Sequence, residues 1–351
     1  MPFYISIIIP TSRSAKIREE TFQSISQAAM DNDVEVLVVE NGVKNDNFQN
    51  KVLSYGFRYY HEPVEGLLAA RHHGVQKAKG DILVFIDDDV ILSESWITAV
   101  RQTFTDVKVH LATGPSRPLF LGSKPDWLDS FWVDVEPDGR ALYQLSLLEL
   151  SPCIQKICPT LVWGLNFGIR KETLFNLGGF HPDGVPWEMR KYRGDGESGL
   201  ARKAKDHDLT AVYNPQMALE HIVPLNRMTI EYFEKRSYLE GISSSYAQKR
   251  QEPPQIKPSP DVNSDSIPKK PFWKRILSKI MRISLLILRP KRSTATKDSN
   301  LLSLQDRINL KQKEGYEFHR EEMEKDPLLV KWVVKENYWD FTYPSETLKE
   351  A

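Results

Sequence analysis

Three consecutive carboxylates, Asp87, Asp88 and Asp89, directly follow an apolar run over residues 82–86. Aspartate is disfavoured in strands and like charges repel, so fold stability gives no reason to gather three of them at one strand end. A hard divalent cation, Mn2+ or Mg2+, gives such a reason, because it takes oxygen ligands and commonly bridges the phosphates of a nucleotide. An acidic cluster at a helix start is the simpler alternative, and it explains one or two carboxylates better than three.

An alternation of β-type runs and helix-compatible stretches surrounds the triplet over residues 1–113. Strands are expected at residues 4–10, 34–40, 57–61, 82–86 and 109–113, with helices at 17–30, 47–55, 66–79 and 93–104. Continuous apolar strands separated by helices predict an α/β fold with a Rossmann-like, mostly parallel sheet. Ligands of such sheets bind beyond the carboxyl ends of the strands, which is where the triplet lies.

The composition divides the rest of the chain into further parts. Residues 114–250 are expected to complete a domain over 1–250, beginning with an irregular, proline-containing excursion over 114–160. Strands and helices are expected to return from residue 161, and a long helix over 226–250 closes the domain. A proline-rich linker over 251–271, a basic amphipathic helix over 272–292 and a helical segment over 301–351 are expected to follow.

The charges are balanced overall but unevenly placed. Among 351 residues, 47 Lys and Arg oppose 47 Asp and Glu, which excludes a uniformly basic nucleic-acid-binding chain, and we expect no nucleic-acid partner. Residues 266–297 hold ten basic residues and no acidic one, so 37 basic residues oppose 47 acidic ones elsewhere. The amphipathic segment either packs its apolar face on the protein or binds an anionic membrane surface.

The N-terminus begins with a β-type run and shows no signal-peptide pattern, and the longest apolar stretch of the basic part is far too short to span a bilayer. We therefore expect a cytoplasmic protein, peripheral to the inner face of a membrane if the basic segment binds lipid.

Three motifs in order, IIIPTSR, VEVLVVENG and GLLAARHHGVQKAKGDILVFIDDDV, resemble the nucleotide-sugar half of the family 2 glycosyltransferases with the GT-A fold. The resemblance covers residues 4–113 and, more loosely, 161–246. It implies that Pro10 and Thr11 line the pocket of the nucleotide base. It also implies that Glu40, which stands where the family usually has Asp, hydrogen-bonds uracil or ribose.

The same resemblance assigns the diphosphate and metal contacts. Arg71 matches the family's Ala-Arg-Asn motif, with His72 in place of Asn, and an Arg at a helix start is suited to bidentate diphosphate contact. Asp87 is implied to face the ribose or support the metal, Asp88 is the variable middle position of the donor site, and Asp89 is the direct metal ligand.

The second half is implied to bind the acceptor and to supply a base. WGLNFGIRKETLFNLGGF resembles a family segment in which Gly164 permits close approach of the sugar and Asn166 hydrogen-bonds it. In GDGESGLARKAK the spacing to the following Leu and Lys aligns Glu197 with the family's general base, and Asp195 is the alternative base. A base that deprotonates the attacking hydroxyl in one displacement implies inversion of the anomeric configuration. The alternative is a helix N-cap followed by a favourable first-turn Glu.

Three further residues are assigned by position. His221 follows a strand where GT-A enzymes often present a His to the metal or diphosphate, although a lone His is more often a satisfied structural residue. Trp163 and Trp187 flank the acceptor half, and aromatic faces suit the apolar faces of sugars. Core packing is an equal alternative for Trp163.

The resemblance and the triplet together predict a metal-dependent, inverting glycosyltransferase that uses a nucleoside-diphosphate sugar, most simply a UDP-sugar, and a glycan or lipid-linked acceptor. It would act in glycan or polysaccharide biosynthesis. Two other classes remain open at this stage: a metal-dependent nucleotidyltransferase, for which the sequence lacks a glycine-rich triphosphate loop, and a non-catalytic carbohydrate-binding protein of the same fold.

Overall fold

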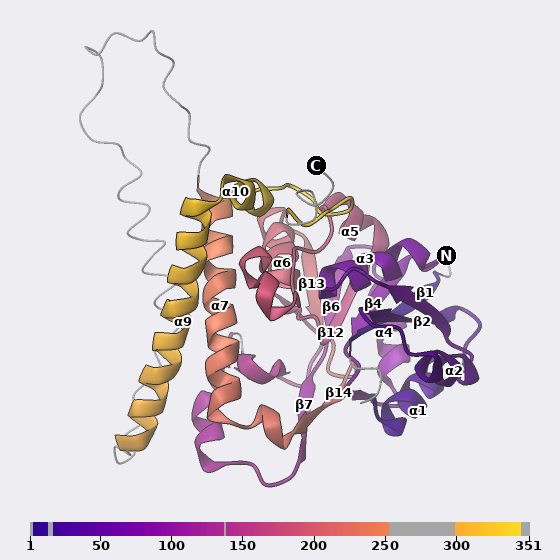
Figure 1. Ribbon diagram of the computed structural model, residues 1–351. Helices are drawn as coiled ribbons and strands as arrows, with labels where there is room; N and C mark the ends of the chain where they lie inside the picture. The colour runs from indigo at the N-terminus through magenta and orange to yellow at the C-terminus, as the bar shows by residue number, and fades with distance from the viewer. Residues whose placement is uncertain (1–2, 13–16, 137, 253–298, 345–351) are drawn as a thin grey trace.

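The computed structural model describes residues 3–12, 17–136, 138–252 and 299–344. Its N-terminal part is a parallel sheet with strand order β4-β1-β2-β3 (Figure 1). These strands are β1 (Ile5–Thr11), β2 (Val34–Asn41), β3 (Arg58–Glu62) and β4 (Ile82–Ile86). The crossover helices are α1 (Glu19–Ala28), α2 (Asp46–Ser54), α3 (Leu67–Lys77) and α4 (Trp96–Phe104). The α/β prediction is confirmed, and the bounds predicted for β4 are those observed.

The sheet buries two separate cores because alternate residues of its strands point to opposite faces. On one face Ile8 and Leu37 pack with α3, and on the other Ile7 and Val36 pack with α1, α2 and α4. Both faces of β1 and β4 are buried along their whole length, which explains why these strands read as uninterrupted apolar runs.

The second half of the chain extends the same sheet. The order continues beyond β4 as β12 (Asn166–Arg170), β6 (Val109–Thr113), β13 (Thr210–Tyr213) and β11 (Gln155–Ile157). β12 is antiparallel to both neighbours, so the sheet is mixed on this side and parallel only around β1, β2, β3 and β4 and between β6 and β13. Because β12 lies between β4 and β6, the two expected halves share one sheet.

The expected irregular excursion over 114–160 is wrong in part, because several short strands lie within it. A second sheet has the order β5-β14-β7-β10-β9-β8. Its strands are β5 (Val90–Leu92), β7 (Ser116–Leu121), β8 (Val133–Val135), β9 (Gly139–Leu142), β10 (Leu147–Leu150) and β14 (Leu219–Pro224). Short 3-10 turns join the elements: η2 (Asp126–Phe131), η3 (Tyr143–Leu145), η4 (Pro159–Leu161), η5 (Trp187–Tyr192) and η6 (Leu225–Arg227).

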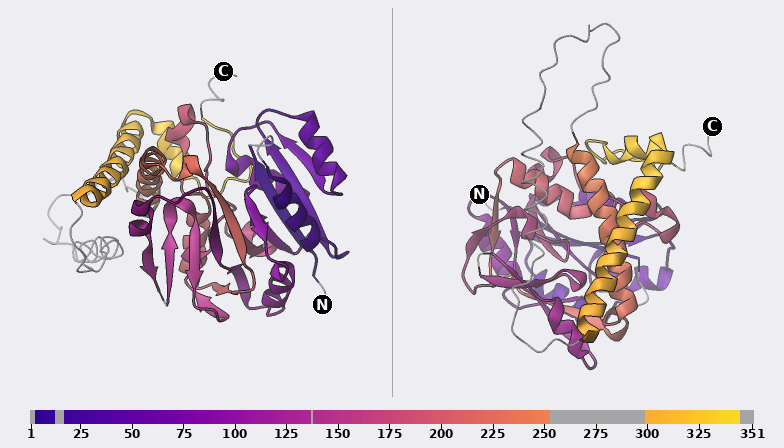
Figure 2. Two further views of the ribbon diagram at one scale, coloured as in Figure 1. Left: turned by 90° about the horizontal axis from the view of Figure 1, so that it is seen from below. Right: turned by 90° about the vertical axis from the view of Figure 1, so that its left-hand side faces the viewer.

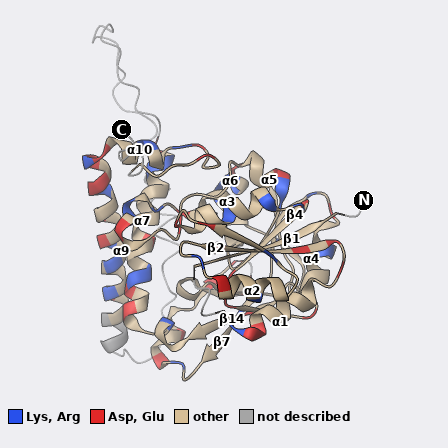
Figure 3. Cartoon of the chain, turned by 45° about the vertical axis from the view of Figure 1, so that its right-hand side comes forward, with Lys and Arg blue, Asp and Glu red and all other residues tan. Residues whose placement is uncertain are grey.

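Helices α5 (Lys171–Asn176) and α6 (Gly196–Asp206) complete the sheet domain, and a helical layer stands beside it (Figures 1 and 2). This layer consists of α7 (Ile230–Gln251), α9 (Ser299–Lys325) and α10 (Pro327–Val333). α7 and α9 run parallel and very close. A Cβ at Gly241 would overlap the backbone of α9, and one at Gly315 would overlap the backbone of α7. Figure 3 shows residues of both signs of charge interspersed along α9.

The segment after α10 returns across the domain and packs on α3. The ring of Trp339 stacks on His72 with centroids 4.2 Å apart, and the Tyr338 hydroxyl is 2.6 Å from that of Tyr246 on α7. His72 donates from Nδ1 to the Tyr338 carbonyl and accepts at Nε2 from the Phe180 amide, and burial lowers its pKa to about 3. The neutral imidazole is therefore a fixed bridge between the C-terminal segment and the sheet domain.

Two predictions lie outside the described residues: most of the proline-rich linker, from residue 253, and the whole basic helix over 272–292. In the described part of the chain, no helix combines the length and the apolar character that a bilayer span requires.

Candidate functional site

The polar residues predicted from the strand ends meet at the carboxyl edge of the parallel strands. Pro10 and Thr11 are the last two residues of β1. The Thr11 hydroxyl donates to the buried carboxylate of Asp88, so the middle Asp of the triplet ties the end of β4 to the end of β1.

Glu40 stands at the end of β2 with 1% of its surface exposed. Its Oε2 accepts from the Asn45 amide at 2.9 Å and from the Tyr59 hydroxyl at 2.6 Å. Its Oε1 has no hydrogen-bond partner among the described residues. A buried carboxylate oxygen without a donor is costly, so Glu40 retains the capacity to accept one hydrogen bond from a ligand.

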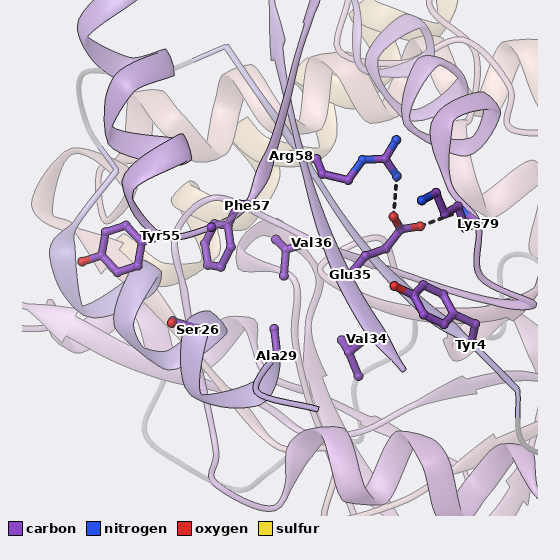
Figure 4. A pocket seen from close by; sticks show the side chains of 11 residues that line it. Tyr4, Ser26, Ala29, Val34, Glu35, Val36, Tyr55, Phe57, Arg58 and Lys79 are labelled. Carbon is purple, nitrogen blue, oxygen red and sulfur yellow. Dashed lines mark hydrogen bonds and ion pairs between the residues drawn. The ribbon is translucent and has the colours of Figure 1, made fainter. Parts of the chain in front are cut away.

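A cavity of about 240 Å³ opens at the opposite, amino edge of the same strands, between Tyr4, Phe57, Arg58 and Lys79 (Figure 4). Its one buried carboxylate, Glu35, already accepts from the Ser6 hydroxyl, the Lys79 amide and Arg58. The other charged side chains labelled at this cavity in Figure 4 are Arg58, which pairs with Glu35, and Lys79, which is exposed. We therefore place the site at the carboxyl edge.

Asp89, His221 and Arg227 form a cluster between β4 and β14. Oδ2 of Asp89 is 2.8 Å from Nη2 of Arg227, and its Oδ1 is 3.6 Å from Nε2 of His221. His221 donates from Nδ1 to the Leu145 carbonyl at 2.8 Å, which leaves the lone pair on Nε2, and Arg227 donates to that lone pair at 2.7 Å. A carboxylate and an imidazole lone pair thus converge on one guanidinium.

The donor set of this cluster fits a divalent cation, because a cation would meet the same two acceptors that now meet the Arg227 guanidinium. Within the described ranges, no three His, Cys, Asp or Glu side chains form a closed metal cage. Mg2+ and, by the same preference for oxygen, Mn2+ are commonly held by one or two protein ligands together with water and substrate phosphates. Two protein ligands are therefore sufficient.

Asp87 is half-buried beside this cluster. Burial raises its pKa, the charges of Asp89 and Glu197 raise it further, and those of Arg71 and His221 oppose the rise. Charged residues that the sequence analysis placed in two different halves of the chain therefore affect the pKa of one carboxyl, that of Asp87.

Arg71 and Glu197 form a largely buried ion pair, with Nη1 of Arg71 3.0 Å from Oε2 of Glu197 and the guanidinium over the ring of Phe180. The Gly164 amide donates to Oε1 of Glu197 at 3.2 Å. A Cβ at Gly164 would overlap the Arg71 guanidinium, so only glycine leaves room for the pair. Although burial favours the neutral acid, the positive charge and hydrogen bonds of Arg71 prevail and the pKa of Glu197 is lowered. Glu197 is therefore ionised at neutral pH.

Asp195 lies deeper, with 4% of its side chain exposed. Its Oδ1 is 2.6 Å from Nδ1 of His181, and its Oδ2 pairs with Arg202. Burial alone would raise the pKa of this carboxyl, but these two partners outweigh burial and lower it. Both oxygens are thus engaged within the protein.

We expect Asp195→Asn to lower the free energy of unfolding by about 3 kcal/mol, because it leaves the Arg202 charge without its buried partner. Since the pKa of Asp195 is lowered on folding, this stability is present above the ordinary pKa of Asp and is lost as the pH falls through the lowered value. Urea unfolding of wild type and variant at pH 7 and at about pH 2.5, below the ordinary pKa of Asp, measures it, with exposed Asp206→Asn on the same helix as control. An unchanged stability together with a large loss of turnover would instead make Asp195 the base.

Asn166 does not lie where a sugar contact requires. It is 1% exposed, its Oδ1 accepts from Nε1 of Trp96 and its Nδ2 donates to the Met217 carbonyl. These bonds fasten β12 to α4 and to the loop before β14, so the expected hydrogen bond to the sugar does not agree with the structure.

The two tryptophans have different surroundings. Trp163 is half-buried next to Gly164 and packs against Tyr143, with ring centroids 5.0 Å apart. Trp187 is 42% exposed and packs instead on Tyr238 of α7. The cations over its ring are Arg190 and Lys235, and among the described residues it contacts neither Arg71 nor Glu197 through its ring. Trp163 therefore borders the candidate acceptor side, and nothing brings Trp187 to it.

The sequence prediction missed Arg236 of α7, whose pKa is influenced by the charges of Asp183 and Glu197, and Tyr143, which pairs with Trp163. The sequence carried no signal for either residue. Arg236 is located by the structure, because it lies seven residues before Ser243 on the same side of α7 and Ser243 donates to the Gly194 carbonyl at 2.7 Å. Tyr143 comes from the region expected to be irregular.

The chain is similar in sequence to known glycosyltransferases. Residues 6–158 match the model of glycosyl transferase family 2. A 90-residue stretch is 33% identical to an uncharacterized glycosyltransferase of Rickettsia felis, covering 25% of this chain and 15% of that protein. A 121-residue stretch is 28% identical to the glycosyltransferase AglE of Haloferax volcanii, covering 32% of this chain and 39% of that protein. The chain thus spans well under half the length of these curated relatives.

Among solved structures, the mannosyltransferase PcManGT of Pyrobaculum calidifontis, in complex with GDP-Man and Mn2+, superposes with a TM-score of 0.49 at 17% identity, over 97% of this chain and 89% of that one. Residues 6–158, which contain β1, β2, β4 and the aspartate triplet, are therefore similar in sequence to glycosyl transferase family 2.

Proposed function

We propose that the protein transfers a sugar from a nucleoside-diphosphate sugar to an acceptor hydroxyl with inversion, assisted by Mn2+ or Mg2+, in the biosynthesis of a glycan or polysaccharide. The observation that carries this proposal is the pairing of two clusters at one edge of the sheet. The Asp89–His221 pair has the donor atoms for a cation, and the Arg71–Glu197 pair supplies a guanidinium and an ionised carboxylate.

On the donor side, Glu40 would accept a hydrogen bond from the base or ribose through Oε1. Asp89 and His221 would hold the metal, which when bound offsets the negative charge that develops on the departing diphosphate. Arg227 holds both of these side chains in place beforehand. Arg71 is 2% exposed and donates to Glu197. A bound diphosphate would accept part of the charge-assisted hydrogen bonding that Arg71 now gives to Glu197.

On the acceptor side, Glu197 would take the proton of the attacking hydroxyl. Oε1 and Oε2 are held by the Gly164 amide and by Arg71, so the carboxylate is oriented before the acceptor arrives. Any transfer of Arg71 hydrogen bonds to the diphosphate would make Glu197 a stronger base once the donor is bound. A single displacement by the deprotonated hydroxyl, opposite the leaving group, gives inversion.

The experiment that tests this function is nucleotide-sugar binding and turnover by the purified protein. UDP and GDP should each be tried with Mn2+, and one of them is expected to raise the melting temperature only when metal is present, because a ligand that binds the native state stabilises it. Hydrolysis of the matching sugar nucleotide should release the nucleoside diphosphate. Absence of binding and of hydrolysis for all donors would contradict the proposal, and release of pyrophosphate from a nucleoside triphosphate would indicate a nucleotidyltransferase.

We also propose that residues 272–292 bring the enzyme to an anionic membrane surface, which suits a lipid-linked acceptor. The support is the sequence alone: clustered Lys and Arg beside an apolar face. We expect vesicles containing anionic lipid to co-sediment the protein, with each basic residue contributing about 1 kcal/mol. Replacement of Arg275, Lys279 and Arg282 by Glu should abolish the co-sedimentation and leave nucleotide binding intact. Co-sedimentation unaffected by these replacements would leave intramolecular packing as the role of the segment.

A further inference from the structure

Arg236 differs from the other arginines around the site. Arg71 pairs with Glu197, Arg193 with Asp183, Arg202 with Asp195 and Arg227 with Asp89. Among the described residues, the Arg236 guanidinium makes no ion pair and no hydrogen bond, although the side chain is half-buried. A half-buried guanidinium with no protein partner keeps five donors available for a ligand.

The geometry of α7 directs Arg236 toward the start of α6. Seven residues make almost two helical turns, so Arg236 and Ser243 lie on one stripe about 10 Å apart along the helix. Ser243 faces the catalytic domain, because its hydroxyl donates to the Gly194 carbonyl and accepts from Arg193. α7 stands beside α6, whose first turn carries Glu197 (Figure 1).

Glu197 pairs with Arg71 on the donor side of the site, and its charge also acts on Arg236. Burial lowers the pKa of Arg236, but Tyr232, Glu240, Asp183 and Glu197 outweigh burial and raise it, so the guanidinium stays charged. Arg236 therefore lies within electrostatic range of the candidate base.

An aromatic pair borders the same side. Tyr143 and Trp163 pack together, and α7 contacts η3, the turn that carries Tyr143. Burial and the charge of Glu240, one turn from Arg236, raise the pKa of Tyr143, which places the ring near this part of α7. Trp163 is adjacent to Gly164, whose amide binds Glu197. The side of Glu197 nearest α7 thus combines aromatic surface with a guanidinium that has no ion pair among the described residues.

We propose that the acceptor carries an anionic group, a phosphate or a carboxylate, that Arg236 binds while the acceptor hydroxyl meets Glu197 and its sugar ring lies against Trp163 and Tyr143. This inference rests on the proposed glycosyltransferase function, in which Glu197 is the base. Arg236 is a specificity-determining residue in this scheme, because it selects acidic acceptors over neutral ones. The planar, five-donor guanidinium suits both phosphate and carboxylate oxygens.

Binding of three matched probes tests the proposal: glucose 6-phosphate, glucuronate and glucose, each titrated calorimetrically into full-length protein saturated with Mn2+ and the nucleotide that binds. We expect one or both acids to bind and glucose to bind at least tenfold more weakly. Arg236→Gln should weaken the acid about 10- to 100-fold, the range of a hydrogen bond to a charged group, and leave nucleotide affinity unchanged. Arg236→Lys should restore part of the loss. Exposed Lys235→Gln, one residue away, is the control.

Preference for glucose 6-phosphate would identify a phosphate-bearing acceptor, and preference for glucuronate a carboxylate-bearing one. Equal binding of all three probes, binding of none, or an effect of Lys235→Gln equal to that of Arg236→Gln would overturn the proposal. Failure of the proposed function has a different signature: no nucleotide binds with Mn2+, while the probes can still be titrated alone and compared between wild type and Arg236→Gln.

Discussion

Replacement of Glu197 by Gln is expected to lower the rate of sugar transfer about 10²- to 10⁴-fold, the usual contribution of a general base, with the affinity for nucleotide and metal changed little. Gln keeps the size of the side chain and can accept through its one oxygen from Arg71 or from the Gly164 amide, but it cannot take the acceptor proton. Transfer rates at saturating donor, together with nucleotide binding measured separately, distinguish loss of the base from loss of the donor site.

The control for this variant is Glu172→Gln, an exposed carboxylate in the first turn of α5, which occupies a similar helix-start position away from the site. The pH dependence gives a second check. Because the pKa of Glu197 is lowered, the acidic limb of the wild-type rate should lie below the usual range of a Glu carboxyl. Transfer by Glu197→Gln at the wild-type rate would remove Glu197 from the base role.

Replacement of Asp89 by Ala is expected to abolish the stabilisation that Mn2+ adds to nucleotide binding and to lower turnover at least about 100-fold, since a bound cation contributes several kcal/mol to the leaving diphosphate. The variant removes one of the two acceptors that converge on Arg227 and leaves the other, His221, in place. Melting temperatures with nucleotide, with and without Mn2+, measure the effect.

The same strand offers a matched control for Asp89→Ala. Asp81 lies at the opposite end of β4, where its carboxylate accepts from the Tyr4 amide at 3.0 Å. Asp81→Ala should cost some stability and leave the metal dependence of nucleotide binding as in the wild type. A metal response that survives in Asp89→Ala would show that the cation is held elsewhere.

The donor half could be predicted closely because its signals are local. β4 is apolar throughout and ends at the triplet, and both its bounds and the position of the carboxylates at the sheet edge are confirmed. The second sheet could not be predicted in the same way, since β8 and β9 are three and four residues long and β7 pairs with β14, which comes much later in the sequence. Strands this short carry too few residues to show a period of two.

The site shows the same division. The Arg71–Glu197 pair joins residues 126 apart, and its two members were predicted separately from motifs. Asn166 was misplaced because a motif gives a position along β12 and not the partners of its side chain, which turned out to be Trp96 and the Met217 carbonyl. Whether a polar side chain faces a ligand or a neighbouring element is decided by packing, which spacing alone does not encode.

The parallel course of α7 and α9 has a consequence for how the chain is held together. Between Gln251 and Ser299 the chain must return along the length of α7, about 33 Å at 1.5 Å per residue. The contacts that retain residues 299–344 lie outside this connection: the close approach at Gly241 and Gly315, and the bridge from His72 to Tyr338. A protease cut between residues 253 and 298 would therefore leave two fragments joined as a noncovalent complex, with residues 299–344 in the position of a subunit.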